Sequence, residues 1–209
     1  SQKKEIATDQ TKADKVYNGI QKEISDYTLK SIYYAYLSEK KGIETTIYNY
    51  LKLAFKQGAK INKLHNNPTV KKIKSARKKV SSEAHRLKGL LRFRTLANGI
   101  YYGPIEPDYN VISFLARHFT HRLADQDWII HDLNRSQAAV YNKEEWQLTT
   151  LTEEEIELTD TENKYQQLWK EFFSSTAIDN RKNQRLQQQN MPKKYWKHLI
   201  EKSITTPKS

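Results

Sequence analysis

Apolar residues recur every three or four positions through the first part of the chain, which is the period of an amphipathic helix. Helices are predicted from about Thr8, from Ser25 or Asp26, from Ile43, and from Pro68 to about Gly89. The Ser25 hydroxyl can cap the second of these helices. Gly42 and Gly58 are expected to bound the third, and proline is well tolerated at the first position of the fourth.

The period changes to that of a strand after Gly89. Strands are predicted over 90–96, 100–105, 128–133, 137–141 and 146–151. Asn98 and Gly99 are a strong hairpin signal between the first two strands, because both turn positions favour positive φ. A helix is predicted between the second and third strands, with Asp108 or Asn110 as its cap. The middle of the chain therefore reads as hairpin–helix–hairpin with antiparallel strands.

Further helical patterns occupy 163–174 and 180–189, and Pro192 opens a last short helix. The predicted fold class is α+β, in which an N-terminal helical layer packs on a small antiparallel sheet and C-terminal helices cover an edge. One domain is expected over 9–201. Its helical part is 9–88, its sheet part 89–151 and its C-terminal helices 160–201, while 1–8 and 203–209 are expected to be flexible ends.

Positive charge is concentrated in two blocks of this 209-residue chain, whose formal net charge is +12. Between Lys60 and Arg94 there are twelve basic residues and one acid, Glu83, a balance of +11. A second block, Arg181 to Lys208, has eight basic residues and one acid. Such a charge attracts polyanions, of which nucleic acid is the commonest. The alternative is a solvated helix face that lysine keeps soluble.

The expected phosphate contacts come from both blocks. They are Lys71, Lys72, Lys74, Lys78, Lys79, Arg86, Lys88, Arg92 and Arg94, extended by Arg181, Arg185, Lys193 and Lys194. Arg92 and Arg94 alternate on a predicted strand beside Phe93, as on a nucleic-acid platform or on the outer face of an ordinary sheet. The seven tyrosines from Tyr17 to Tyr50 are mostly at helical spacing and are predicted to lie in the core or at its edge.

The chain contains no cysteine, which excludes disulfides, thiolate zinc sites and iron–sulfur ligation by its own residues. No apolar run reaches the length of a membrane span, so no membrane partner is expected. His118 and His121 stand three apart without a third ligand at a diagnostic spacing. No metal and no cofactor are therefore predicted, and a cytoplasmic location is expected.

Candidate catalytic groups are few, since neither a Gly-rich phosphate loop nor a nucleophile elbow is present. Glu106 and Asp108 lie between prolines on a stiff turn, where they could orient a substrate, although capping by Asp108 is the simpler interpretation. His131 and Asp132 end an apolar strand, where catalytic groups and ordinary solvated strand ends both occur. With His85, these four make the set that an enzyme would gather around one cleft.

Four long motifs resemble those of a bacterial family of DNA-metabolism proteins, the SAM/SPL family. They are His85–Arg94, Tyr102–Asp108, Trp128–Asp132 and Met191–Lys197, within a resemblance that runs from Ala13 to Glu201. Members of that family begin with an additional N-terminal segment and have His where this chain has Tyr109.

The resemblance implies a DNA repair or modification context. Members accompany a radical-SAM protein similar to spore photoproduct lyase, and a similar domain is fused to uracil-DNA-binding proteins. The radical-SAM cluster needs cysteine ligands, which this chain lacks. The expected function is therefore an accessory nucleic-acid-binding protein, with DNA as the partner ahead of RNA. The alternatives are an enzyme acting on a nucleobase or nucleotide, and a protein-interaction module that docks an acidic partner by its basic face.

Overall fold

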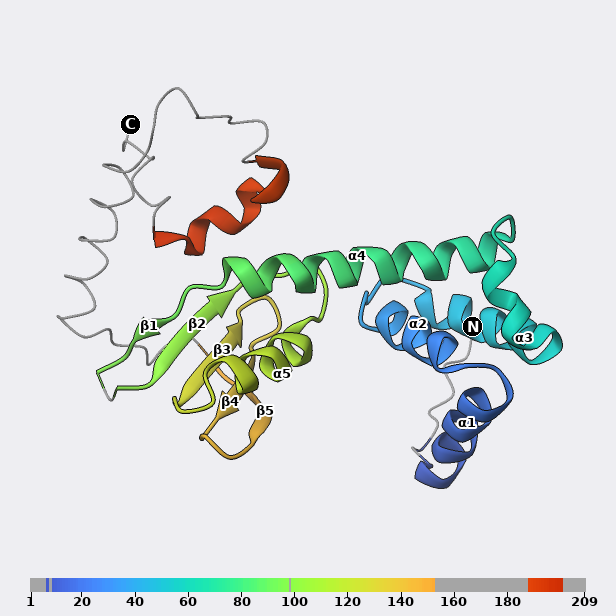
Figure 1. The fold of residues 1–209 in the computed structure, drawn as a ribbon, viewed down its shortest axis with the longest axis horizontal. Coiled ribbons are helices and arrows are strands. Elements are labelled where there is room, and N and C mark those ends of the chain that lie inside the picture. Colours follow the sequence, from blue (N-terminus) through green and yellow to red (C-terminus); the bar gives the residue numbers. More distant parts are fainter. Residues whose placement is uncertain (1–6, 8, 98, 153–187, 201–209) are drawn as a thin grey trace. The chain divides into compact units, whose positions relative to one another are not determined.

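The structure, a computed structural model, describes residue 7 and residues 9–97, 99–152 and 188–200 (Figure 1). The chain divides into two compact units, Ser1–Ser81 and Ser82–Ser209. Helix α4, Pro68–Leu90, contributes residues to both of them. The division falls seven residues before the predicted end of the helical part at residue 88, and the single domain over 9–201 stays a prediction. The predicted helix 163–174 and most of 180–189 lie outside the described residues. So do residues 1–6 and 8 of the expected flexible end 1–8, and all of 203–209.

The first unit is helical. It contains α1 (Gln10–Glu23), α2 (Asp26–Tyr36), α3 (Ile43–Gln57), the 3-10 helix η1 (Gly58–Lys63) and the first part of α4. Ser25 caps α2 as predicted, because its hydroxyl accepts a hydrogen bond of 3.2 Å from the backbone N–H of Thr28. Helix α3 begins after Gly42 and ends before Gly58, also as predicted.

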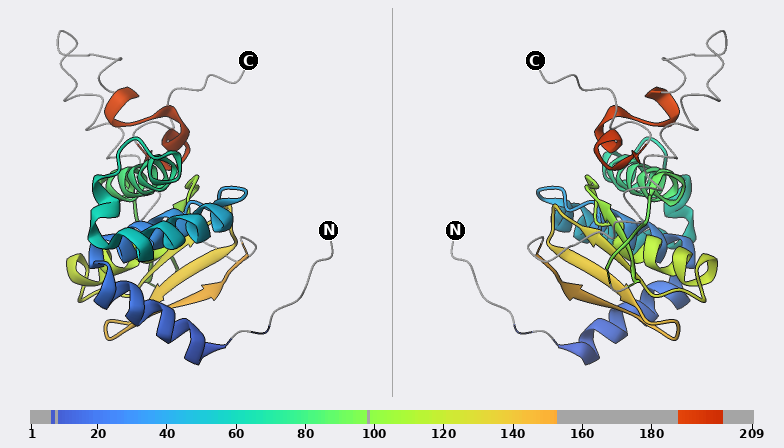
Figure 2. Two further views of the ribbon diagram at one scale, coloured as in Figure 1. Left: turned by 90° about the vertical axis from the view of Figure 1, so that its right-hand side faces the viewer. Right: turned by 90° about the vertical axis from the view of Figure 1, so that its left-hand side faces the viewer.

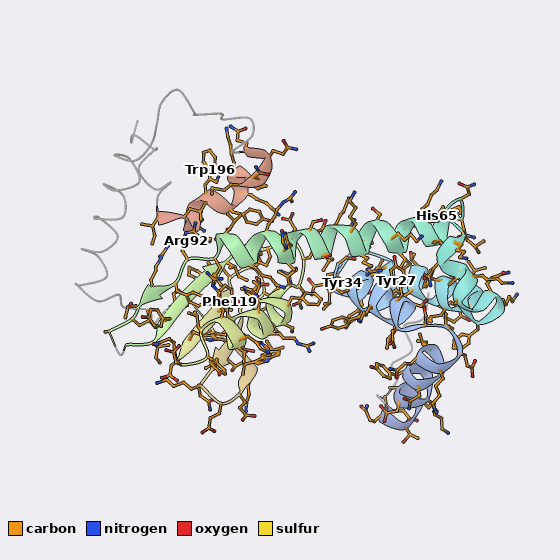
Figure 3. All side chains as sticks on the ribbon, in the orientation of Figure 1. Tyr27, Tyr34, His65, Arg92, Phe119 and Trp196 are labelled. Atoms are coloured by element: carbon orange, nitrogen blue, oxygen red, sulfur yellow. The ribbon has the colours of Figure 1, made fainter. Side chains whose placement is uncertain are left out.

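The core of this unit includes Tyr50, Ile61 and Ile73, but most of its tyrosines lie outside that core. The exposed fractions are 51% for Tyr17, 43% for Tyr27, 46% for Tyr33, 60% for Tyr36 and 61% for Tyr48. The prediction that the tyrosines lie in the core or at its edge is therefore wrong for these five, which are exposed. The reason is visible in α2, where the buried positions are the small residues Thr28, Ser31 and Ala35. The small side chains take the packed face, so the tyrosines of α2 occupy its other faces; Figure 3 labels two of them, Tyr27 and Tyr34.

The second unit holds a five-stranded sheet in the order β1-β2-β3-β4-β5. Its strands are β1 (Arg94–Thr95), β2 (Tyr101–Ile105), β3 (Trp128–Asp132), β4 (Gln137–Tyr141) and β5 (Trp146–Thr150). Strands β3 to β5, yellow to orange, lie side by side in Figure 2. The α+β class is thus confirmed.

The predicted all-antiparallel sheet is wrong at one pairing, because β2 and β3 run parallel, with Gly103 opposite Ile130. Helix α5 (Ile112–Arg122) connects the two strands and packs against β3 and β4. A crossover helix returns the chain to the end of the sheet from which it started, so the next strand runs in the same direction. The other three pairings are antiparallel, and the sheet is mixed.

Strand β1 is shorter than the predicted strand over 90–96, and α4 takes the first residue of that range, Leu90. The hairpin that follows is formed: the N–H of Gly99 donates to the carbonyl of Leu96 at 2.8 Å, and Gly99 has a φ of +83°. That left-handed conformation favours glycine, as the sequence predicted. Asn98 lies outside the described residues.

Helix α5 is not capped by either predicted residue. Its N-cap position is Val111, with no side-chain cap hydrogen bond. The carboxylate of Asp108 instead meets Lys194 of the 3-10 helix η4 (Lys193–His198), which packs against β2. Among the described helices, none has the length and apolar character that crossing a bilayer would require.

Candidate nucleic-acid interface

The part of α4 in the first unit presents lysines to solvent. Lys71, Lys72, Lys78 and Lys79 are all exposed, while Val70, Ile73 and Val80 of the same helix are buried. Within the described ranges, no carboxylate lies within ion-pair distance of these four lysines. This surface, defined by Lys71, Lys72, Lys78 and Lys79, is called the α4 lysine face below.

Lys74 was predicted to belong with them, but it is used inside the unit. Its Nζ atom donates to the carbonyl of Asn62 at 2.7 Å and lies 3.2 Å from Nδ1 of His65, which Figure 3 labels. Arg77 is also engaged, since it bonds the hydroxyl of Ser31 at 3.1 Å and lies 4.0 Å from the ring centre of Tyr27. The inner basic residues of α4 thus hold the unit together, and the outer ones remain available to a ligand.

A hollow of about 520 Å³ opens beside the α4 lysine face. Lys40 and Lys41 line it from the α2–α3 connection, and Lys71 and Lys72 line it from α4. Burial and the nearby charge of Lys79 lower the pKa of Lys40. Gathering ammonium groups around one hollow is electrostatically unfavourable without a counter-charge, so this basic pocket is a favourable place for an anion.

The basic residues predicted in the second unit differ in availability. Arg86 and Lys193 are exposed, and Lys88 is half-buried near His118, whose pKa is lowered by burial and by that lysine. Arg92 donates to the carbonyl of Gly89 at 2.9 Å.

Arg94 is half-buried, and its Nε atom is buried without a hydrogen-bond partner among the described residues. Arg181 and Arg185 lie outside the described residues. The basic residues of this unit therefore differ from one another in exposure, whereas all four lysines of the α4 lysine face are exposed.

Lys194 is bound to acids on both sides. Its Nζ atom lies 2.6 Å from Oε1 of Glu83 and 2.5 Å from the carboxylate of Asp108. Burial lowers its pKa, but the hydrogen bonds to Asp108 and Glu83 outweigh that effect and raise the pKa above its usual value. A lysine neutralised by two carboxylates has little attraction left for a phosphate, so its predicted phosphate contact is not favoured by this arrangement.

Glu83, the lone acid of the basic block between Lys60 and Arg94, is the centre of this arrangement. It is 3% exposed, and it accepts hydrogen bonds from the Tyr195 hydroxyl at 2.7 Å and from the backbone N–H of Tyr109 at 2.8 Å. Burial, together with Glu83, raises the pKa of Tyr195. A signal for it did exist: Glu83 falls on the apolar stripe of α4, three residues after Val80 and four before Leu87.

The other acids and histidines proposed for an enzyme have structural partners. Glu106 pairs with Lys197 and lies 3.2 Å from Nε2 of His198. The bond from Lys197 lowers the pKa of Glu106, whereas burial lowers that of His198 despite the neighbouring carboxylate.

Asp132 is fully buried and bonds Arg135 at 3.0 Å, and Arg135 in turn bonds the carbonyl of Asp108 at 3.2 Å. Burial raises the pKa of Asp132 against the effect of Arg135. This bridge brings Asp108 and Asp132 into one network that fixes the turn after β2 against the turn after β3.

His131 is enclosed in the sheet, where its ring nitrogens meet the Tyr102 hydroxyl at 2.9 Å and the Leu151 carbonyl at 3.0 Å. His85 lies exposed on α4. Four of the five candidates, all except His85, therefore make hydrogen bonds or ion pairs within the protein. Within the part of the chain that the structure describes, no two of the five are hydrogen-bonded to each other as an acid and a base would be. Among the described residues, no group of three or more His, Cys, Asp or Glu could hold a metal ion.

Comparison with known proteins adds one match. Residues 41–201 match the family model DUF4130, a domain of unknown function. No curated protein and no solved structure matches the chain.

Proposed function

The chain belongs to the DUF4130 family, a domain of unknown function, and we propose that it is an accessory nucleic-acid-binding protein in DNA repair or modification. The α4 lysine face supplies the contacts to the phosphate backbone, and the basic pocket extends them. DNA is the proposed partner ahead of RNA, because the resemblance to the SAM/SPL family implies a DNA context.

One observation carries this proposal: the lysines of α4 sort into two kinds. Lys74, which faces the body of the unit, is bonded to protein groups, while the four exposed lysines of the α4 lysine face have no carboxylate partner among the described residues. An ordinary solubilising surface mixes both signs of charge. A face of one sign raises the local concentration of polyanions and displaces their counterions on binding.

The enzyme alternative receives less support from the geometry. Glu106, Asp108 and Asp132 are held in ion pairs, and His131 is enclosed between Tyr102 and Leu151. A general base needs a lone pair directed at a substrate, and the buried Asp132 and His131 direct theirs at the protein.

The proposed partner protein is a radical-SAM protein for DNA modification or repair. This part of the proposal rests on the family resemblance, and it agrees with the lack of cysteine, since residues of this sequence cannot ligate such a cluster. Co-expression of the chain with a radical-SAM protein encoded beside it tests the pairing. Co-elution of the two proteins in gel filtration would support it, and separate elution would contradict it.

Binding itself is tested by fluorescence anisotropy with single-stranded DNA, duplex DNA and RNA of one sequence, from low to physiological salt. Micromolar or tighter binding is expected, with a log–log salt slope of about −3 to −4 if four lysines each neutralise one phosphate. The variant Lys71→Ala/Lys72→Ala should flatten that slope by about 2. The matched control is Lys12→Ala/Lys15→Ala, which removes two exposed lysines from α1. No binding at low salt would overturn the proposal and would identify the α4 lysine face as a docking surface for an acidic protein.

A further inference from the structure

An apolar groove of about 590 Å³ lies on the helices of the first unit. Its walls come from α1, α2 and α3. The aromatic and aliphatic residues that line it are Tyr17, Leu29, Ile32, Tyr33, Tyr36 and Ile47. Tyr17 and Tyr36 are 51% and 60% exposed, so large ring surfaces face solvent here.

Several exposed aromatic rings in one groove indicate a binding site. A single exposed tyrosine is ordinary, but a gathered apolar surface of this kind marks an interaction site. Tyrosine suits such a site because its rigid ring offers a large face with only two side-chain torsions to fix. The aromatic groove is therefore a candidate binding surface in its own right.

The charge beside the groove indicates what would bind there. Both depressions are lined by the start of α3, since Ile43 and Thr46 line the basic pocket and Ile47 lines the aromatic groove. Ile43 and Ile47 are one turn apart, or about 6 Å along the helix axis. A ligand that reaches both depressions would place an apolar, flat part against the tyrosines and an anionic part among Lys40, Lys41, Lys71 and Lys72.

We propose that the first unit binds single-stranded nucleic acid, with unpaired bases stacked on the tyrosines of the aromatic groove and backbone phosphates held in the basic pocket. This inference rests on the proposed function and specifies its ligand. Stacking platforms next to a basic groove are the usual construction for a single strand. In a duplex the base faces are covered by their neighbours, so a duplex would use the lysines but not the tyrosines. A purely hydrophobic protein partner would leave the four lysines of the pocket without a counter-charge.

Tyrosine variants test the inference in the intact chain. Tyr17→Ala and Tyr36→Ala should each weaken binding of a labelled single strand about tenfold, while duplex affinity and the salt slope stay unchanged. Tyr36→Phe should keep the affinity, because stacking needs the ring and not the hydroxyl. The matched control is Tyr48→Ala, which removes a 61% exposed tyrosine of α3 that lies outside the groove, under Lys52.

The outcomes separate this inference from the one on which it rests. One outcome is that the single strand binds no more tightly than the duplex and that the groove variants have the same affinity as Tyr48→Ala. This would overturn the role of the groove and leave phosphate binding by the α4 lysine face intact. Loss of all nucleic-acid binding in the parent protein would overturn both. Circular dichroism melting of each variant distinguishes a lost contact from a lost fold, and a groove variant that melts like the parent but loses single-strand affinity supports the inference.

Discussion

The hydroxyl of Tyr195 donates a hydrogen bond of 2.7 Å to Oε1 of Glu83, across 112 residues of sequence. Lys194 and the backbone N–H groups of Asp108 and Tyr109 bond the same carboxylate. A buried carboxylate is tolerated where donors satisfy its oxygens, and four donors do so here. Glu83 therefore joins α4, the turn after β2 and η4 within the second unit.

Replacement of Glu83 by glutamine should lower the free energy of unfolding by about 3 kcal/mol, because the amide turns a donor toward donors and leaves Lys194 without its buried partner. Urea unfolding followed by tryptophan fluorescence measures this change in the second unit, since all four tryptophans lie after residue 82. The exposed Glu144→Gln serves as the control and should change the value by less than about 0.5 kcal/mol. Equal effects of the two substitutions would contradict the central role of Glu83.

Two lysines that the sequence predicted alike should behave oppositely. Lys194→Met should destabilise the second unit by about 1 to 3 kcal/mol, since it leaves Glu83 and Asp108 without their cation, and should barely change nucleic-acid affinity. Lys72→Met should leave stability within about 0.5 kcal/mol and weaken binding at low salt. Thermal melting and anisotropy on both variants check the pair. A large binding loss in Lys194→Met with unchanged melting would contradict this division.

A methyl group at Gly103, in the middle of β2, would press on the side chains of Leu91 and Phe93. A Cβ atom there would lie 2.9 Å from Cδ1 of Leu91 and 3.1 Å from the ring of Phe93. Gly103→Ala should therefore cost about 1 to 3 kcal/mol of unfolding free energy, as overpacked cores do. Gly89→Ala is the matched control: it lies within α4 with open space around it, so alanine should stabilise by about 0.5 to 1 kcal/mol. Effects of the same sign in both variants would contradict the tight packing inferred at Gly103.

His198 should make the second unit less stable in mild acid. Burial lowers its pKa in the folded protein, so the unfolded chain takes up the proton first, and stability falls as pH drops below about 6.5 toward the lowered value. His198→Gln cannot titrate, and it keeps an N–H that can face Glu106. Urea unfolding at pH 7 and pH 5 should show a smaller loss of stability in this variant.

The exposed His85→Gln controls for histidine removal as such and should keep the parent's loss between the two pH values. His118, whose pKa is also lowered by burial, keeps part of the acid sensitivity in both variants. A His198→Gln protein that loses as much stability as the parent would show that the half-buried His198 does not control stability in this pH range.

The sequence predicts element positions well where one period dominates. Strands β3, β4 and β5 lie within a residue of the predicted ranges, because each alternates or is uniformly apolar between clear turns. It does not predict the direction of pairing between β2 and β3, since periodicity carries no information on which edge a returning strand joins. That direction depends on the crossover through α5, which was itself predicted as a helix.

The candidate site was predictable in part. The exposed lysines of α4 follow from the apolar stripe opposite them, because a helix that buries Val70, Ile73 and Val80 must turn its other residues outward. The sequence does not predict that Lys74 and Lys194 are engaged within the protein. Their partners, the carbonyl of Asn62 and the carboxylate of Glu83, come close to them only in the tertiary fold. The sequence does not predict the aromatic groove either, because periodicity does not show that the small residues of α2 are the buried ones.

The long loop that Glu83 closes also has a consequence during synthesis on the ribosome. Lys194 follows Glu83 by 111 residues, so at about 5 to 20 residues per second the carboxylate waits roughly 5 to 20 seconds for its partner to be made. Throughout that interval, α4 and the sheet can form local contacts but cannot bury Glu83 with its charge matched. The second unit should therefore complete its fold only after translation has passed η4, and nascent chains stalled before that point should remain open to protease.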